Sequence, residues 1–185
     1  MNKYVRAGID IVTAQIKTLI LKALPRCIFS CGKLARIAPT SEIIVHRNGT
    51  IKIGERVRMD ARSTFSVQTN AVINIGNNVS FGVNNMVICH ELISIGNNVQ
   101  FSPNVLVYDH DHDYRVRGGI SAMQYKTAPI VIGDNVWIGA NTVILKGSMI
   151  GDNCVIGAGS IVKGKVPNGV LFVQKRENIM VEYEQ

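Results

Sequence analysis

Two histidines in an acid-rich stretch are the residues of this sequence best suited to chemistry. His110 and His112 alternate with aspartates over residues 109–113. An imidazole with a pKa near 6.5 can accept a proton near neutral pH, so either ring suits a general base. His90 lies twenty residues before His110, and three neutral imidazoles are also a ligand set that zinc accepts. The residue types therefore allow either general-base catalysis or zinc binding. Which of the two applies depends on how the surrounding elements position the rings.

A six-residue period dominates the sequence after this stretch. Isoleucine recurs at positions 132, 138, 144, 150 and 156, mostly with glycine next and a small residue four places later. An amphipathic helix would need a period of 3.6 residues and a half-buried strand a period of two. The pattern therefore predicts an all-β solenoid with three short faces per coil, in which the isoleucines point inward. Cys154 occupies a small-residue position, so we interpret it as packing.

The spacing of the coils predicts one protruding loop. Glycines of corresponding Ile-Gly pairs stand at positions 54, 76, 96, 133 and 151, at intervals of 22, 20, 37 and 18 residues. Three faces of six residues make one coil of 18, and a few residues added in the early coils account for the intervals of 22 and 20, but the third interval is too long. The surplus must leave the stack, and the polar stretch of about 109–128 is the candidate. Long loops in compact repeat proteins are usually functional.

Composition and charge narrow the class of protein. The 185 residues are 46% hydrophobic, which is enough for one folded domain. Of the net charge of +7, residues 1–36 carry +6, so the rest offers no basic stripe for a nucleic acid, and none is expected as a partner. The four cysteines form no C-x-x-C pair, and we expect them to be reduced.

The N-terminal segment predicts an amphipathic helix that ends before Pro25. An apolar stripe runs from Val5 through Ile9, Val12 and Ile16 at helical spacing. Residues 1–24 could lie on an anionic membrane, or the stripe could pack against the body of the protein or a sister subunit. We find neither an apolar run of eighteen residues nor a signal-peptide cleavage site, so we expect a cytoplasmic protein. If residues 1–24 lie on a membrane, the protein would be peripheral on its inner face.

Residues of about 50–170 resemble the hexapeptide-repeat acyltransferases, specifically the maltose, galactoside and bacterial surface-polysaccharide O-acetyltransferase branch. The resemblance is strongest over residues 135–140 (NVWIGA) and 150–162 (IGDNCVIGAGSIV). It implies a left-handed parallel β-helix, a homotrimer and acetyl-CoA bound between subunits. The expected division is an N-terminal helix and connector over 1–36, the β-helix over 37–166 and a C-terminal tail over 167–185.

The resemblance also implies a catalytic residue. The family places a histidine at the start of its protruding loop, and ungapped counting from Ile95-Gly96 assigns that role to His112, with His110 as the rival. A sugar hydroxyl is a poor nucleophile near neutral pH, and the imidazole would take its proton during direct attack on the thioester. The backbone N–H of Ala140 would face the thioester oxygen.

Further site residues follow from the same resemblance. Asn84, Asn85 and Asp109 are candidates for acceptor binding, although both asparagines could instead be corner-turn residues. The candidates for binding acetyl-CoA are Trp137, Gly139, Ala140, Gly157, Ala158 and Lys163. Trp137 could equally lie at the trimer interface.

The sequence therefore predicts acetyl transfer from acetyl-CoA to a sugar hydroxyl, in a bacterial surface-polysaccharide pathway such as capsule or O-antigen synthesis. One alternative is a zinc hydratase like the γ-type carbonic anhydrases, but the H-x4-H pair of that class is missing, so no metal is expected. The other alternative is a sugar-binding solenoid without catalysis.

Overall fold

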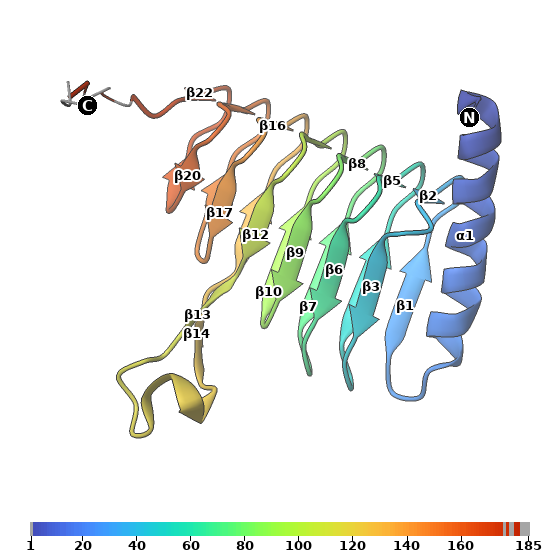
Figure 1. Ribbon diagram of the computed structural model, residues 1–185, viewed down its shortest axis with the longest axis horizontal. Coiled ribbons are helices and arrows are strands. Elements are labelled where there is room, and N and C mark those ends of the chain that lie inside the picture. The colour runs from blue at the N-terminus through green and yellow to red at the C-terminus, as the bar shows by residue number, and fades with distance from the viewer. Residues whose placement is uncertain (1, 176, 178–179, 182–185) are drawn as a thin grey trace, which may run out of the picture.

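The computed structural model describes residues 2–175, 177 and 180–181 of the chain. It is a left-handed parallel β-helix whose coils stack in a row, with one α-helix at the N-terminal end (Figure 1). This confirms the predicted fold class. No helix within the described residues is long and apolar enough to cross a membrane.

Each coil contributes one short strand to each of three parallel sheets, which we call faces A, B and C. Face A contains β1 (Ile28–Cys31), β4 (Thr50–Ile53), β7 (Val72–Ile75), β10 (Leu92–Ile95), β15 (Ile130–Ile132), β18 (Met149–Ile150) and β21 (Lys165–Val166). Face B contains β2 (Arg36–Ile37), β5 (Arg58–Met59), β8 (Ser80–Phe81), β11 (Gln100–Phe101), β16 (Trp137–Ile138), β19 (Val155–Ile156) and β22 (Leu171–Phe172). Face C contains β3 (Glu42–Val45), β6 (Thr64–Val67), β9 (Met86–Cys89), β12 (Leu106–Tyr108), β17 (Val143–Leu145) and β20 (Ile161–Val162).

The interior is a single column of aliphatic and aromatic side chains. Ile138, Ile144 and Ile156 are at most 1% exposed, as the six-residue period predicts. Phe65, Phe81 and Phe101 contact one another through three successive coils: the first two rings meet edge to face with centroids 4.7 Å apart, and the last two stack with centroids 4.5 Å apart. Cys154 is fully buried, which confirms its packing role, and all four cysteines are free.

The corners between the faces are tight turns that repeat from coil to coil. Their third residue has positive φ and is most often asparagine, which tolerates this backbone conformation better than most residues. The asparagine side chains bond to one another along the stack, as in the row Asn84, Asn104 and Asn141, with donor–acceptor distances of 3.1 Å. These rows keep successive coils in register.

The stack is longer than the range 37–166 that the sequence predicts for the β-helix. β1 pairs with β4 from Ile28 onward, and β22 pairs with β19 up to Phe172. The first coil therefore includes part of the expected connector, and the last includes the start of the expected tail. Paired residues lie 22, 20, 37, 18 and 16 residues apart along the stack, so the coils tighten toward the C-terminus.

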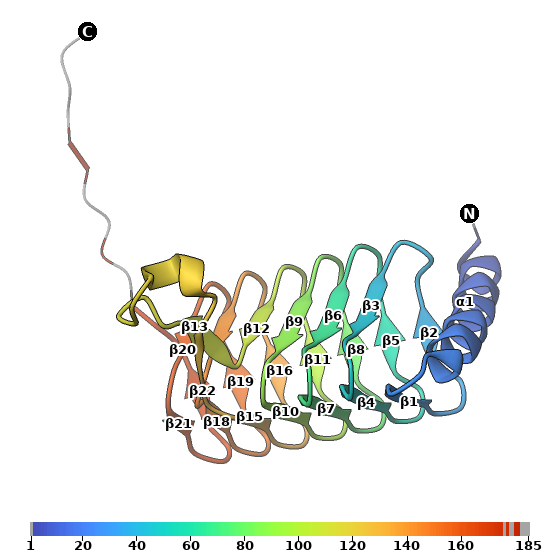
Figure 2. The same cartoon turned by 90° about the horizontal axis from the view of Figure 1, so that it is seen from below.

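The 37-residue interval contains an arm that leaves the stack between β12 on face C and β15 on face A. It consists of β13 (His110–His112), a 3-10 turn η1 (Gly119–Ala122) and β14 (Tyr125–Thr127), with β13 and β14 antiparallel. The arm, in yellow, projects away from the row of coils in Figure 1, and in Figure 2 it is seen over the C-terminal coils. The predicted loop of about 109–128 thus coincides with a β-ribbon.

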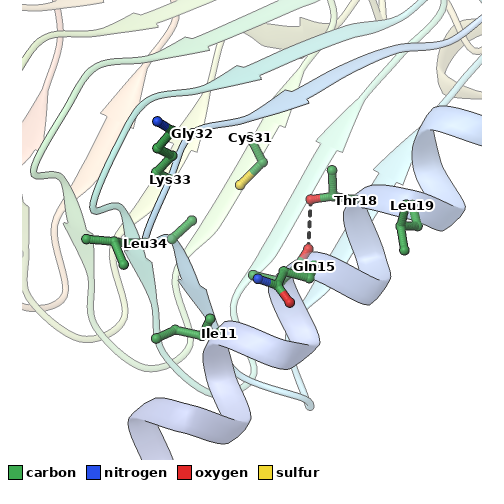
Figure 3. A pocket seen from close by; sticks show the side chains of 10 residues that line it. Ile11, Gln15, Thr18, Leu19, Cys31, Gly32, Lys33 and Leu34 are labelled. Carbon is green, nitrogen blue, oxygen red and sulfur yellow. Dashed lines mark hydrogen bonds between the residues drawn. The ribbon is translucent and has the colours of Figure 1, made fainter.

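The helix α1 (Lys3–Ala23) begins after the cap residue Asn2 and ends before Pro25, as predicted. It covers the N-terminal end of the stack with a narrow side that buries Asp10, Ala14 and Leu21. A hollow of about 410 Å³ remains between helix and first coil, where Ile11, Gln15 and Thr18 face Cys31, Gly32, Lys33 and Leu34 (Figure 3).

The apolar stripe of α1 points away from the body of the protein. Val5, Val12, Ile16 and Leu19 are 52–71% exposed. The idea that this stripe packs against the body is therefore wrong for this chain. The cause is steric, because a small residue such as Ala14 lets the helix approach the first coil closely, whereas the branched side chains of the stripe would hold it away.

Candidate active site

A buried carboxylate anchors the arm where it leaves the stack. Asp109 is 0% exposed, and its oxygens accept the backbone N–H groups of His90, Glu91 and Leu92 at 2.8, 2.8 and 3.0 Å. The Cys89 thiol also donates to it at 3.3 Å, and burial, followed by the charge of Asp109, raises the pKa of that thiol. Asp109 thus holds the corner of the previous coil. Its assignment to acceptor binding is corrected, because its oxygens are taken by the protein itself.

His110 lies at the base of the arm and is held on several sides. Its Nδ1 is 3.3 Å from an oxygen of Asp109, and its ring stacks on His90 with centroids 3.7 Å apart. Only 13% of its side chain is exposed. Burial, followed by the neighbouring charge of His110, lowers the pKa of His90, so His90 favours its neutral form in this stack. His110 is therefore oriented, but its ring offers little access to a substrate.

His112 lies two residues farther out and is exposed. The pleat of β13 places it on the same side as His110, and its ring centroid lies 4.7 Å from that of Tyr125 on β14. Ion pairs of Asp113 with Lys126 at 3.1 Å and of Asp111 with Lys146 at 3.4 Å brace the ribbon around it. His112 is therefore an accessible imidazole on a braced ribbon.

The two asparagines differ in what they contact. Asn85 is 1% exposed, and its amide donates to the Gly82 carbonyl at 2.8 Å and accepts from the Val105 N–H at 2.7 Å. Its role is to fasten a corner, so its assignment to acceptor binding is also corrected. Asn84 is partly exposed, with φ of 58°, and belongs to an asparagine row. The corner-turn alternative therefore describes both residues in this chain.

The turn that contains Ala140, at the corner between faces B and C, has a backbone donor without an acceptor in the described part of the chain. Ala140 is the second residue of the turn 139–142, whose third residue, Asn141, has φ of 58°, as in a type II turn. The Ala140 carbonyl accepts the Gly159 N–H at 2.7 Å, but the described residues provide no acceptor for the Ala140 N–H itself. This N–H can therefore serve an oxygen of a bound molecule.

Of the other residues expected to bind acetyl-CoA, all but Lys163 lie at this corner or on the face B strand beside it, over two coils. Trp137 is 54% exposed, and its indole Nε1 donates to Ser102 Oγ at 3.1 Å, which fixes the ring across the preceding coil. Gly139 is buried. A Cβ there would stand 2.5 Å from the Ala158 backbone nitrogen, so this position requires glycine. Ala158 is exposed and Gly157 is half-buried, so small residues leave this corner open. Lys163 is also exposed, but it lies at the next corner, between faces C and A.

One chain does not bring the two halves of the site together. The arm leaves between faces C and A, whereas the turn with Ala140 lies between faces B and C. A strand of face C separates the two corners, which corresponds to roughly 10 Å or more of backbone. The sequence indicates the residue types of the site but not this separation, which follows from the three-sided coil.

The imidazoles do not form a metal site among the described residues, where no three His, Cys, Asp or Glu side chains converge. His90 and His110 meet through their ring faces, with an interplanar angle of 30°, which does not aim their nitrogens at a common point.

Comparison with known proteins supports the repeat and the fold. Residues 129–164 match the sequence family described as bacterial transferase hexapeptide (six repeats). The candidate acetyltransferase YvoF of Bacillus subtilis (strain 168) is 35% identical over 97 residues, which is 52% of this chain. The match covers only 40% of the length of YvoF.

Two solved structures share the fold. AntD, an N-acyltransferase from Bacillus cereus in complex with dTDP and coenzyme A, superposes with a TM-score of 0.67 at 21% identity, covering 84% of this chain and 80% of AntD. The hexapeptide-repeat acetyltransferase VCA0836 of Vibrio cholerae, complexed with acetyl coenzyme A, gives a TM-score of 0.53 at 24% identity, covering 89% of this chain and 78% of that protein.

Proposed function

This chain belongs to the hexapeptide-repeat acetyltransferase family, and from that premise we propose that it transfers the acetyl group of acetyl-CoA to a hydroxyl of a sugar. The observation that carries the proposal is that the chain provides both an exposed histidine on a braced arm and, at an open corner, a backbone N–H without an acceptor among the described residues. The acceptor is a sugar of a bacterial surface polysaccharide, as in the branch that the sequence resembles.

In the reaction, His112 moves the proton and the Ala140 N–H stabilises the developing charge. His112 accepts the proton of the sugar hydroxyl while the hydroxyl oxygen attacks the thioester carbonyl carbon. The Ala140 N–H donates to the carbonyl oxygen as negative charge develops there. The carbon–sulfur bond then breaks, CoA leaves as the thiol after taking a proton from His112, and the acetyl ester is released. Because both substrates are bound together, no acyl-enzyme is needed.

We also propose a homotrimer with active sites shared between neighbouring chains. Support comes from the separation of the arm and the Ala140 corner in one chain, since a second copy could bring its own corner to the arm. Face C adds an outward apolar surface, on which Leu106, Val143 and Ile161 stand in register. Light scattering tests the assembly: a trimer supports the proposal, and a fully active species of 20.2 kDa contradicts it.

The exposed stripe of α1 supports a location at the inner, cytoplasmic face of a membrane. The stripe runs the length of the helix, and the one acid of residues 1–36, Asp10, is buried against the body. Apolar side chains among basic ones, without an exposed acid, suit a helix lying on anionic lipid. A membrane-linked glycan would be confined to the same surface.

A panel of acceptors tests the proposed reaction. The purified chain is mixed with acetyl-CoA and free sugars, nucleotide sugars or lipid-linked sugars, and release of the CoA thiol is followed. Acceptor-dependent release supports the transferase, and a product ester cleaved by hydroxylamine identifies oxygen as the acceptor atom. A hydroxylamine-resistant amide would overturn the O-acetyl assignment. Glycan binding without release would indicate the sugar-binding alternative.

A further inference from the structure

A row of arginines occupies the N-terminal part of face B. Arg36 begins β2, Arg58 begins β5, and the two are register partners in adjacent parallel strands. Arg56 stands in the turn just before β5. With Asn78, Ser80 and Gln100, these three arginines line a hollow of about 440 Å³.

This arrangement is electrostatically unfavourable without an anion. Strands in a sheet lie about 4.8 Å apart, and like charges directly opposite each other on neighbouring strands are destabilising. A guanidinium group stays charged at any ordinary pH, so these residues cannot relieve the repulsion by losing protons. A bound anion would relieve it.

The nearby acids compensate only part of the charge. Asp60 lies outside the lining of the hollow and is shared by Arg58 at 3.6 Å and Arg6 at 3.7 Å. Glu55 is 3.9 Å from Arg56 and half exposed. Asp10 is close enough to Arg36 and Arg6 for their charges to act on its pKa. The Nε of Arg58 is buried and forms no hydrogen bond among the described residues beyond its ion pair with Asp60. Three acids thus face four arginines, and the hollow keeps a net positive charge.

The arginines stand in line with the candidate active site. The outward residues of face B follow one another in register from Arg36 through Arg58, Ser80 and Gln100 to Trp137. Three strand spacings separate Arg58 from Trp137, which is about 14 Å. The candidate acetyl-CoA residues Ala140 and Ala158 follow the face B strands of the Trp137 coil and of the next coil, away from the arginines. A sugar ring and its linked phosphate can span the distance between Trp137 and the arginines.

We propose that this hollow binds the phosphate or diphosphate through which the acceptor sugar is linked to its carrier. The proposal rests on the acetyl transfer proposed above and specifies its substrate class as a phosphate-linked sugar rather than a free one. Guanidinium groups match phosphate oxygens with pairs of parallel hydrogen bonds, which gives orientation as well as affinity. The arginines thus hold the carrier end while the sugar hydroxyl reaches the Ala140 corner.

Substitution of single arginines tests the proposal kinetically. Arg36→Gln and Arg56→Gln are compared with Arg47→Gln, which removes the same charge from an exposed corner between β3 and β4. The acceptors are one sugar in four forms: free, as its 1-phosphate, linked to a nucleoside diphosphate, and linked to a short lipid diphosphate. We expect the phosphate-linked forms to have the lower KM. Each hollow variant should raise that KM roughly ten-fold or more, whereas Arg47→Gln should not.

The four acceptors also distinguish the carriers, since a preference for the nucleotide or for the lipid identifies which one supplies the phosphate. Equal use of free and phosphate-linked sugar would overturn the inference. A raised KM for acetyl-CoA instead of the acceptor would also overturn it, because the hollow would then serve the donor.

A binding measurement separates this inference from the proposed reaction. Pyrophosphate is titrated calorimetrically into the full chain and the same variants, whose fold is checked by circular dichroism. Binding that weakens about ten-fold in Arg36→Gln and Arg56→Gln but not in Arg47→Gln supports the site, even if no acceptor releases CoA. Undiminished pyrophosphate binding in both hollow variants, or none in the unaltered chain, refutes it even if the transferase is active.

Discussion

Replacing Asp109 by asparagine should weaken the fold at the base of the arm. The best orientation of the amide keeps its oxygen toward the Glu91 and Leu92 N–H groups and turns its NH2 toward the His90 N–H. One buried backbone donor then loses its acceptor. Hydrogen bonds to charged groups contribute about 1.5–3 kcal/mol, so we expect a loss of about 2–3 kcal/mol in the free energy of unfolding.

Denaturant and thermal unfolding measure this loss. For a chain of this size, each kcal/mol lowers Tm by about 2–4 °C, so Asp109→Asn should lower Tm by roughly 5–10 °C. Hydrogen exchange should speed up first at the amides of residues 90–92. The matched control is Asp111→Asn, whose carboxylate is 58% exposed and pairs only with Lys146. It should cost less than about 1 kcal/mol. If the two variants are equally stable, Asp109 does not hold the corner.

Three further predictions concern the cofactor corner, the helix and the histidine stack. Ala158→Trp and Ala140→Trp should weaken acetyl-CoA binding in calorimetry. The control Ala61→Trp, at the same turn position in an earlier coil, should leave it unchanged. Equal acetyl-CoA affinity in all three variants would place the cofactor elsewhere. Leu19→Glu should weaken binding to anionic vesicles roughly thirty-fold or more, because it removes about 2 kcal/mol of apolar burial. The control Gln124→Glu, on the arm, should leave vesicle binding unchanged. If Leu19→Glu instead disrupts the trimer, the stripe belongs to a subunit interface. Because the pKa of His90 is lowered in the fold, the free energy of unfolding should fall as pH drops below about 6.5. In denaturant titrations, His90→Gln should make the free energy of unfolding depend less on pH. The same pH dependence in this variant and in the unaltered chain would contradict the prediction.

The repeat made most of the fold predictable. Residues such as Ile138 and Ile156 recur at every sixth position because each must fill the same narrow interior, and the structure buries them as predicted. The first coil was harder to find, since its face A strand carries Cys31 where later coils carry isoleucine. One signal was present: Gly32 lies 22 residues before Gly54, and a Cβ on it would meet the Gly54 backbone at 2.5 Å.

The candidate site was less predictable, because it depends on contacts across coils. Asp109 resembles the solvated aspartates that follow it, and only the three-dimensional arrangement brings the amides of residues 90–92 to its carboxylate. The stripe of α1 predicted a helix but not the side that faces solvent, which depends on how closely Ala14 approaches the first coil. Arg36 and Arg58 are 22 residues apart, so their pairing emerges only once the coil length at that point is known.

The most direct test of the proposed chemistry is acceptor-dependent CoA release by the unaltered chain and by His112→Ala. The account predicts that His112→Ala lowers turnover by roughly two to four orders of magnitude, the range for a general base, while acetyl-CoA affinity stays unchanged. His110→Ala should have a smaller effect, and His46→Ala, at an exposed corner, none. Turnover in His112→Ala equal to that of the unaltered chain, or a larger loss in His110→Ala, would contradict the assignment of His112 as the base.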